Sequence, residues 1–173
     1  CSSLSSITFP ASLTTIGGGA FNGCSSLSSI TLPGSITTIS SGVFYGCSSL
    51  ISITLPASLT TIDNYAFKGC TSLSGITFPE SLTTIGKYAF EDCSSLSSIT
   101  FPASLTTIGG GAFNGCSLGN VYLRGKTKVI DVWYQDVFSD FSGTLHVTKE
   151  NYAWAKQTYP WSEFAVIVDD YNP

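Results

Sequence analysis

The feature that most constrains this chain is a unit of 23 residues that recurs in register. The stretch CSSLSSITFPASLTTIGGGAFNG fills residues 1–23 and returns, letter for letter, at residues 93–115, with three near-copies between. Three residue types keep this spacing: Cys1, Cys24, Cys47, Cys70, Cys93 and Cys116; Phe21, Phe44, Phe67, Phe90 and Phe113; Pro10, Pro33, Pro56, Pro79 and Pro102. A fixed period of roughly 20 to 50 residues indicates a solenoid, in which each copy forms one coil and like side chains stack between coils.

Each copy has room for short strands and turns but not for an ordinary helix. Ile7 and Phe9 alternate with polar neighbours, the period of two that is typical of a strand with one buried face. Pro10 ends this strand, and residues 13–16 form a second short extended piece. The glycines at 17–19 predict a turn, and residues 20–22 a tight corner that leads to the next coil.

Charge is scarce in this sequence, and its balance is negative. Only 10% of the 173 residues are charged, against roughly 25% in a typical soluble domain, and the net charge is −4. Without a basic stripe we expect no nucleic-acid partner. No apolar run approaches the roughly 18 residues that span a bilayer, so we expect no direct membrane insertion. Cys1 keeps the phase of the repeat, which favours a fragment of a longer protein over a lipoprotein cysteine.

The repeat resembles the 23-residue leucine-rich repeat of BspA-like surface proteins, whose pattern is approximately L-x-x-I-x-L-P-x-S-L-T-x-I-x-x-x-A-F-x-x-C. The match covers residues 1 to about 123, with Pro, Ala-Phe (Val-Phe in the second copy) and Cys in register through five copies. The resemblance implies a strand-rich leucine-rich-repeat solenoid, right-handed and curved, whose strand-lined side is concave. It also implies an exported protein, at the cell surface or secreted, from a host-associated anaerobic bacterium or a protozoan parasite, with a role in adhesion or host-protein binding.

After Cys116 the repeat fails, because CSLGNVYL is one residue shorter than CSSLSSITF and no sixth proline follows. We therefore divide the chain into five repeats at residues 1–115 and, at residues 116–173, a degenerate final coil with a small α+β cap. Such a cap would cover the open end of the core. Its layout is similar to the C-terminal ends of bacterial members of the same family.

Within this C-terminal segment the pattern predicts strands at residues 143–147 and 164–168 and a short helix at residues 149–157. Thr148 is the expected N-cap of that helix. Residues 131–140 are predicted to form the degenerate coil, in which Val137 and Phe138 stand in the place of Ala-Phe.

Neither the cysteines nor the single histidine indicates a reactive site. Equivalent side chains on adjacent coils point in parallel, which disfavours disulfides, and a linear ladder cannot converge on a tetrahedral zinc ion. We expect buried free thiols, with disulfides and a metal as the alternatives. His146 lies in a predicted cap strand, and GGGAFNG puts Asn22 where the dinucleotide fingerprint needs its third glycine. We expect no enzyme, no cofactor and no metal.

The copies differ from one another mainly at the turn and the corner. In the middle coils this places tyrosines beside charges of both signs, a composition typical of protein recognition surfaces. We call the following nine residues the edge patch: Tyr45, Asp63, Asn64, Tyr65, Lys68, Lys87, Tyr88, Glu91 and Asp92. The alternative explanation is sequence drift at solvated turns that the core does not constrain.

A second candidate surface is the strand-lined face, which is expected to be concave. Its outward residues are mostly small and hydroxylated: Ser6, Thr8, Ser29, Thr31, Ser52, Thr54, Thr77, Ser98, Thr100 and Tyr122. Such a face could hydrogen-bond an extended ligand but offers few anchors, and repetition could strengthen weak contacts through multivalency. Cap aromatics such as Trp154 and Trp161 could stack on sugar rings, although covering the core also explains them.

Together these features predict a non-catalytic, monomeric module for protein binding or adhesion, at the cell surface or secreted. The expected partner is an extracellular protein, either a host matrix protein or a protein on a neighbouring cell. One alternative is a structural spacer that displays another domain. The other is glycan binding through the cap aromatics.

Overall fold

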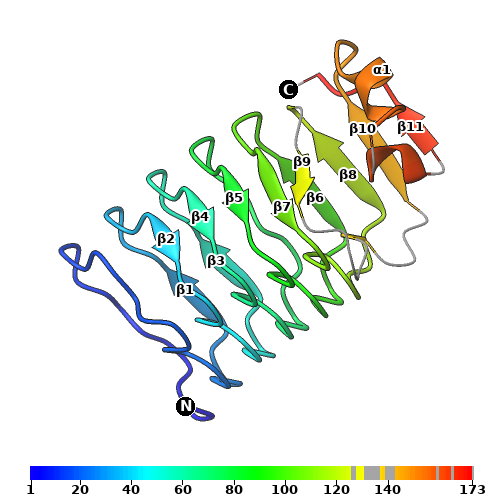
Figure 1. Ribbon diagram of the computed structural model, residues 1–173. Helices are drawn as coiled ribbons and strands as arrows, with labels where there is room; N and C mark the ends of the chain where they lie inside the picture. The colour runs from blue at the N-terminus through cyan, green and yellow to red at the C-terminus, as the bar shows by residue number, and fades with distance from the viewer. Residues whose placement is uncertain (126–127, 131–136, 139–142, 159, 165, 173) are drawn as a thin grey trace.

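The chain forms a single stack of short coils that is closed at one end by a cap (Figure 1). The computed structural model describes residues 1–125, 128–130, 137–138, 143–158, 160–164 and 166–172. All strand pairs in this part of the chain are parallel, and helix is confined to α1 (Tyr152–Ala155) and the 3-10 turn η1 (Trp161–Glu163). The predicted strand-rich solenoid is therefore confirmed.

One row of strands arises from the S-I-T segments of the second, third and fifth copies and from the segments that follow the repeats. β1 (Ser29–Thr31) pairs with β3 (Ser52–Thr54), and a second sheet has the order β6-β8-β10-β11. These four strands are β6 (Ser98–Phe101), β8 (Asn120–Leu123), β10 (Thr144–Val147) and β11 (Val166–Val168). Isoleucine points into the core and serine and threonine point outward, as the period of two predicts.

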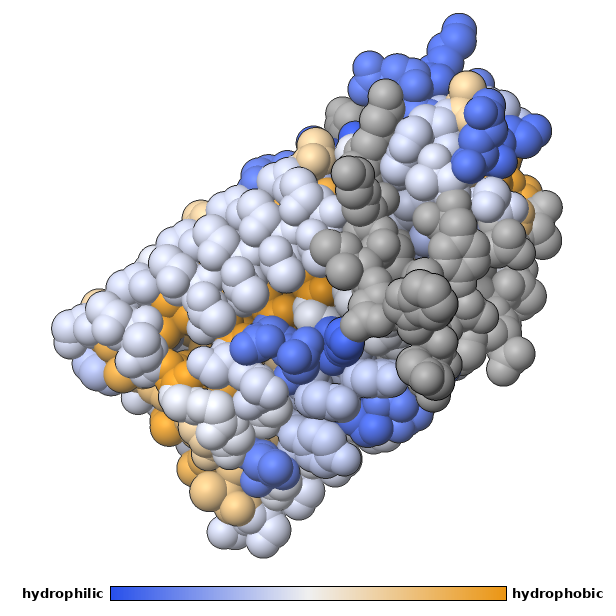
Figure 2. Space-filling view, viewed as in Figure 1, coloured by the Kyte–Doolittle hydropathy of each residue, from blue (hydrophilic) through white to orange (hydrophobic). Residues whose placement is uncertain are grey.

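The other row is a continuous five-stranded sheet built mainly from Thr-Ile pairs. Its members, in spatial order, are β2 (Thr38–Ile39), β4 (Thr61–Ile62), β5 (Thr84–Ile85), β7 (Thr107–Gly109) and β9 (Lys128–Ile130). From β2 to β7 threonine lies beside threonine and isoleucine beside isoleucine. Figure 2 shows the surface that results, with pale residues in rows along the array and strongly hydrophilic ones beside the middle coils and on the cap.

The strand prediction is wrong for the first and fourth copies, where residues 6–9 and 75–78 form no strand. In the fourth copy the backbone of residues 75–78 makes no hydrogen bond to the described coils on either side, so the sheet is split between β3 and β6. Gly75 stands where the other four copies have serine, and a residue without a side chain weakens a strand. The split leaves a depression of about 370 Å³, lined by Ser52, Ile53, Gly75, Ile76, Thr77, Ser98, Ile99 and Thr100.

Phenylalanine rings form a continuous column through the core. Neighbouring rings of Phe21, Phe44, Phe67, Phe90, Phe113 and Phe138 stack with centroids 5.1–5.7 Å apart. The Phe113 N–H donates to the Val137 carbonyl, just as the Phe90 N–H donates to the Ala112 carbonyl. Val137 and Phe138 therefore take the places of Ala-Phe, as predicted, and the remainder of the predicted coil at residues 131–140 lies outside the described residues.

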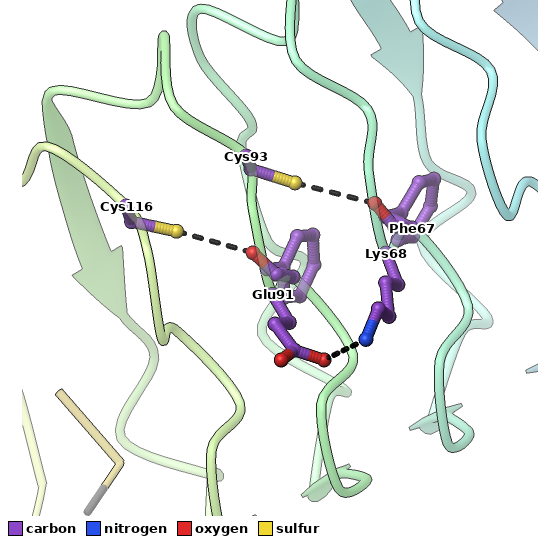
Figure 3. A network of polar contacts seen from close by, with 6 residues as sticks. Phe67, Lys68, Glu91, Cys93 and Cys116 are labelled. Atoms are coloured by element: carbon purple, nitrogen blue, oxygen red, sulfur yellow. Dashed lines mark hydrogen bonds and ion pairs between the residues drawn. The ribbon is translucent and has the colours of Figure 1, made fainter. Parts of the chain in front are cut away.

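The cysteines tie each coil to the one before it. Cys47, Cys70, Cys93 and Cys116 each donate from Sγ to the carbonyl of the phenylalanine 26 residues earlier, at 3.1–3.3 Å. Figure 3 shows two of these contacts, those of Cys93 and Cys116. Burial raises the pKa of Cys47 from 9.0 to about 11 and also raises the pKa of Cys70. The contact with Cys116, together with burial, raises the pKa of Cys93. Cys24, Cys47, Cys70 and Cys93 are buried free thiols, as predicted, whereas Cys1 is exposed and Cys116 half-buried.

The cap helix is shorter than the sequence predicts. It begins after Asn151, and Thr148 is not its N-cap, because the Thr148 carbonyl accepts the Asn151 N–H in a turn that precedes the helix. The Asn151 side chain is buried and donates to the Arg124 carbonyl, which fixes the start of the helix against the end of β8. No helix in the described part of the chain is long and apolar enough to span a membrane.

Candidate binding surface at the turn edge

Two consecutive turns in each coil form the edge of the array. In the first, which we call the glycine turn, the N–H of the fourth residue donates to the carbonyl of the first, as in Gly17–Ala20. In the second, the corner turn, the cysteine N–H donates to the phenylalanine carbonyl, as in Phe21–Cys24. The third residue of each turn has a positive φ, for example 68° at both Gly19 and Gly23. Glycine suits such positions because it has no Cβ to clash with the backbone.

Three residues of the edge patch occupy these glycine positions. Tyr65 and Tyr88 are the third residues of their glycine turns, with φ of 59° and 55°, and Asp92 is the third residue of its corner turn, with φ of 61°. At the equivalent positions the other copies have glycine, with φ of 62–75°. A tyrosine in this conformation costs roughly 1–2 kcal/mol, whereas an aspartate tolerates it better. Glycine would avoid this backbone cost at all three positions.

The two tyrosines form a stacked pair on the outside of the array. Their ring centroids are 5.3 Å apart and the rings are within 10° of parallel. The Tyr88 ring lies over Gly111 of the next coil, where a Cβ atom would come within 2.5 Å of Tyr88 Cε1. Tyr65 is 39% exposed, an unusual fraction for a large aromatic side chain in this protein. The pair thus presents an aromatic surface held rigidly by two adjacent coils.

Charged side chains gather beside the tyrosine pair. Lys68 Nζ lies 2.5 Å from Glu91 Oε2 in an ion pair between adjacent coils (Figure 3). The hydrogen bond to Glu91 raises the pKa of Lys68, and the nearby Tyr45 and Asp92 act in the same direction. The structure therefore brings Tyr45, Lys68, Glu91 and Asp92 together, as the edge patch requires.

Asn64 has a structural role that the sequence did not reveal. Its Oδ1 accepts the backbone N–H of Lys87 in the next coil at 2.8 Å, and Asp63 Oδ1 accepts the Asn64 N–H at 2.7 Å. The coils approach so closely here that a Cβ on Gly86 would lie 2.6 Å from the Asn64 nitrogen. These contacts brace the turn that carries Tyr65, while the Lys87 side chain remains exposed.

The strand-lined face is exposed at nine of its ten predicted residues, and Tyr122 is half-buried. The Tyr122 ring stacks on His146, with centroids 4.4 Å apart, and packs beside Tyr171 at 5.2 Å. His146 Nδ1 lies 2.8 Å from Asp170 Oδ1 and its Nε2 lies 2.9 Å from Asn120 Oδ1. Sequence reasoning missed this cluster. Aligning LHV with VYL as neighbouring strands would have placed His146 beside Tyr122.

The cap aromatics mostly complete the core. Trp161 is fully buried and packs against Phe101 and Phe138 at 6.2 and 5.8 Å. The prediction that a sugar ring could stack on Trp161 is therefore wrong, because no ligand can reach a side chain without exposed surface. Trp154 is half-buried and packs against the same core.

Parallel strands of this length, wound in coils of 23 residues around columns of leucine, isoleucine and phenylalanine, define a leucine-rich-repeat protein. The family profile described as "BspA type Leucine rich repeat region" matches residues 1–119 and 62–147, in six copies. The chain therefore belongs to the BspA-type leucine-rich-repeat family. Proteins of this kind are typically non-catalytic and serve in protein interaction or adhesion.

Solved structures of bacterial leucine-rich-repeat proteins are similar to this chain. The T. pallidum leucine-rich-repeat protein is 31% identical with a TM-score of 0.61, and the match covers 76% of this chain but only 65% of that one. A leucine-rich cell surface protein of Faecalibacterium prausnitzii is 28% identical, with a TM-score of 0.47 and coverages of 61% and 38%. A Bacteroides ovatus leucine-rich-repeat protein is 18% identical, with a TM-score of 0.43 and coverages of 88% and 63%. No curated protein matches the chain.

Proposed function

We propose that this chain is a non-catalytic module that binds an extracellular protein, and that the edge patch makes the contact. The module acts at the cell surface or in secreted form, and its partner is a host matrix protein or a protein on a neighbouring cell. Membership of the BspA-type family supports the interaction role. The geometry of the turns favours the edge patch as the place of contact.

The observation that carries this proposal is the replacement of glycine by Tyr65, Tyr88 and Asp92 at positions of positive φ. Three such residues cost the fold on the order of 3 kcal/mol, a large share of the roughly 5–15 kcal/mol that stabilises a typical domain. Glycine at these positions is compatible with the fold, since the other copies have it. Strained residues of this kind cluster at functional sites.

The chemistry of the patch suits a protein partner. Tyrosine supplies a large contact area with little loss of side-chain entropy, and it is enriched among the residues that dominate binding energy. The Lys68–Glu91 ion pair lies beside the tyrosines and keeps the local charge balanced. This arrangement of an aromatic centre with a polar surround is the usual anatomy of a protein interface.

The test is a binding screen of the purified chain against an array of extracellular-matrix proteins and glycans. The double variant Y65A/Y88A should lose at least about tenfold in affinity for the protein ligand, as expected when hot-spot aromatics are removed. The matched control is T31A/T54A, which changes two exposed residues of the strand-lined face and should bind like the natural sequence.

Three other outcomes would contradict the proposal. Loss of binding in T31A/T54A alone would move the contact to the strand-lined face. Binding of glycans but of no protein would favour a lectin. An array without any ligand would favour the structural spacer, whose only task is to hold another domain away from the cell.

A further inference from the structure

The stack of tyrosines is open at one end. The third residues of the glycine turns run in the order Gly19, Gly42, Tyr65, Tyr88 and Gly111. The Tyr88 ring covers Gly111 and the Tyr65 ring stacks on Tyr88, so both rings lean toward the C-terminal coils. Among the described residues, no aromatic ring stacks on the face of Tyr65 that points toward Gly42.

The space above Gly42 can hold one more planar group. A Cβ atom built on Gly42 would meet nothing closer than Tyr45 Cβ, at 3.9 Å. Tyr45 is itself 39% exposed. A planar group placed here would continue the stack at the spacing of the coils, with Tyr65 as its floor.

Charge decides which planar group fits. Asp63 lies two residues before Tyr65 in the same turn, and only its Oδ1 is engaged, by the Asn64 N–H. None of the ion pairs among the described residues includes Asp63, and Lys68 is held by Glu91. The net charge of the chain is −4. A carboxylate and the electron-rich face of a tyrosine, carried by the same turn, both favour a cation.

We infer that the space above Gly42 binds an arginine side chain of the partner protein, with the guanidinium stacked on Tyr65 and paired with Asp63. Guanidinium is the planar cation among protein side chains, and it both stacks on aromatic faces and pairs with carboxylates. A lysine ammonium is not planar, and a neutral aromatic ring could not form an ion pair with the Asp63 carboxylate. This inference rests on the proposed function and names the group that the edge patch recognises.

The experiment is an NMR titration of the aromatic signals of Tyr65 with three short peptides that differ at one position. The position is arginine, lysine or citrulline, the last being planar like arginine but uncharged. The arginine peptide should shift the Tyr65 signals and bind at least about fivefold more tightly than either other peptide, a difference that stacking and charge together can supply.

Two variants, Gly42→Tyr and Asp63→Asn, test the proposed location of the site, and a further variant serves as the control. Gly42→Tyr would extend the stack into the proposed space and should abolish the shift, whereas the control T31A/T54A, which changes two exposed residues of the strand-lined face, should bind normally. Asp63→Asn keeps an oxygen for the Asn64 N–H but removes the charge, and should weaken the arginine peptide at least about fivefold.

If the lysine peptide binds as tightly as the arginine peptide, the stacking of a guanidinium is refuted. If the citrulline peptide binds as tightly, the role of charge is refuted. If Gly42→Tyr binds the arginine peptide normally, the proposed location of the site is wrong. If Y65A/Y88A loses the protein ligand while Gly42→Tyr and Asp63→Asn keep it, the arginine inference fails and the proposed function stands. If Y65A/Y88A keeps the ligand, the proposed function fails.

Discussion

Raising the pH above about 9 should destabilise this protein steeply through its buried thiols. Cys47, Cys70 and Cys93 are without exposed surface, and burial is a main reason that their pKa values are raised. The unfolded chain exposes the same thiols with a pKa near 9.0 and therefore loses its protons first. The stabilising contribution is fully present below that pH and is lost as the pH rises through the folded values.

The magnitude follows from the number of thiols. Each thiol that is protonated only in the folded state changes the free energy of unfolding by about 1.4 kcal/mol per pH unit. The pKa of Cys47 is raised from 9.0 to about 11, so its titration alone is expected to lower the free energy of unfolding by about 3 kcal/mol in total. The raised pKa values of Cys70 and Cys93 act in the same direction and add to this loss.

The assay is urea unfolding followed by far-UV circular dichroism at several pH values, in the presence of a phosphine reductant that prevents disulfide formation. The variant Cys70→Ala isolates the thiol contribution, because tyrosine and lysine titrations are common to both proteins. Its stability should fall less steeply with pH than that of the natural sequence, by about 1.4 kcal/mol per pH unit. Identical slopes for the two proteins would refute the reasoning.

Two further changes test the packing of the coils. Gly109→Ala should destabilise the protein by about 2 kcal/mol or more by overpacking, because its Cβ would lie 2.5 Å from the Lys87 backbone nitrogen. The control Gly17→Ala places a Cβ that meets nothing within 4 Å and should change stability little. Equal effects of the two changes in urea unfolding would contradict the close approach of the coils at Gly109. Phe67→Ala should cost about 4 kcal/mol by opening a cavity, since Phe67 is fully buried between Phe44 and Phe90. The milder change Phe67→Leu should cost about 1.5 kcal/mol of stability or less. If Phe67→Ala costs less than about 1 kcal/mol, the column of phenylalanine rings contributes little to stability.

The coil and its core could be predicted from the sequence because they depend on side chains that recur at a fixed spacing. Phenylalanine at every 23rd residue becomes a column of stacked rings in any solenoid that closes one coil per copy. The Val137–Phe138 pair could be assigned by the same logic, although the surrounding letters had diverged. The edge patch followed from the complementary observation, that variable letters gather at one place in the repeat.

The remaining features depend on contacts between segments that the repeat does not relate. At residues 75–78 the backbone lacks hydrogen bonds to the neighbouring described coils, and Gly75 is only a weak sign of this break in the sequence. The helix begins three residues later than predicted, where the Asn151 side chain donates to the Arg124 carbonyl. His146 contacts Asp170 and Asn120, which lie on segments far apart in the sequence. The positive φ values of the edge patch were readable in principle, since Tyr65 aligns with glycine in three other copies.

The central claim is that the edge patch keeps non-glycine residues, against the preference of its backbone, because they bind a partner. The most direct measurement compares the stability and the binding of the triple variant Y65G/Y88G/D92G with those of the natural sequence. Relief of the backbone should outweigh the lost ring stacking, so that the free energy of unfolding rises by about 2 kcal/mol, while affinity for the array ligand falls at least about tenfold. A variant that binds its ligand normally, or that is less stable than the natural sequence, would contradict the account.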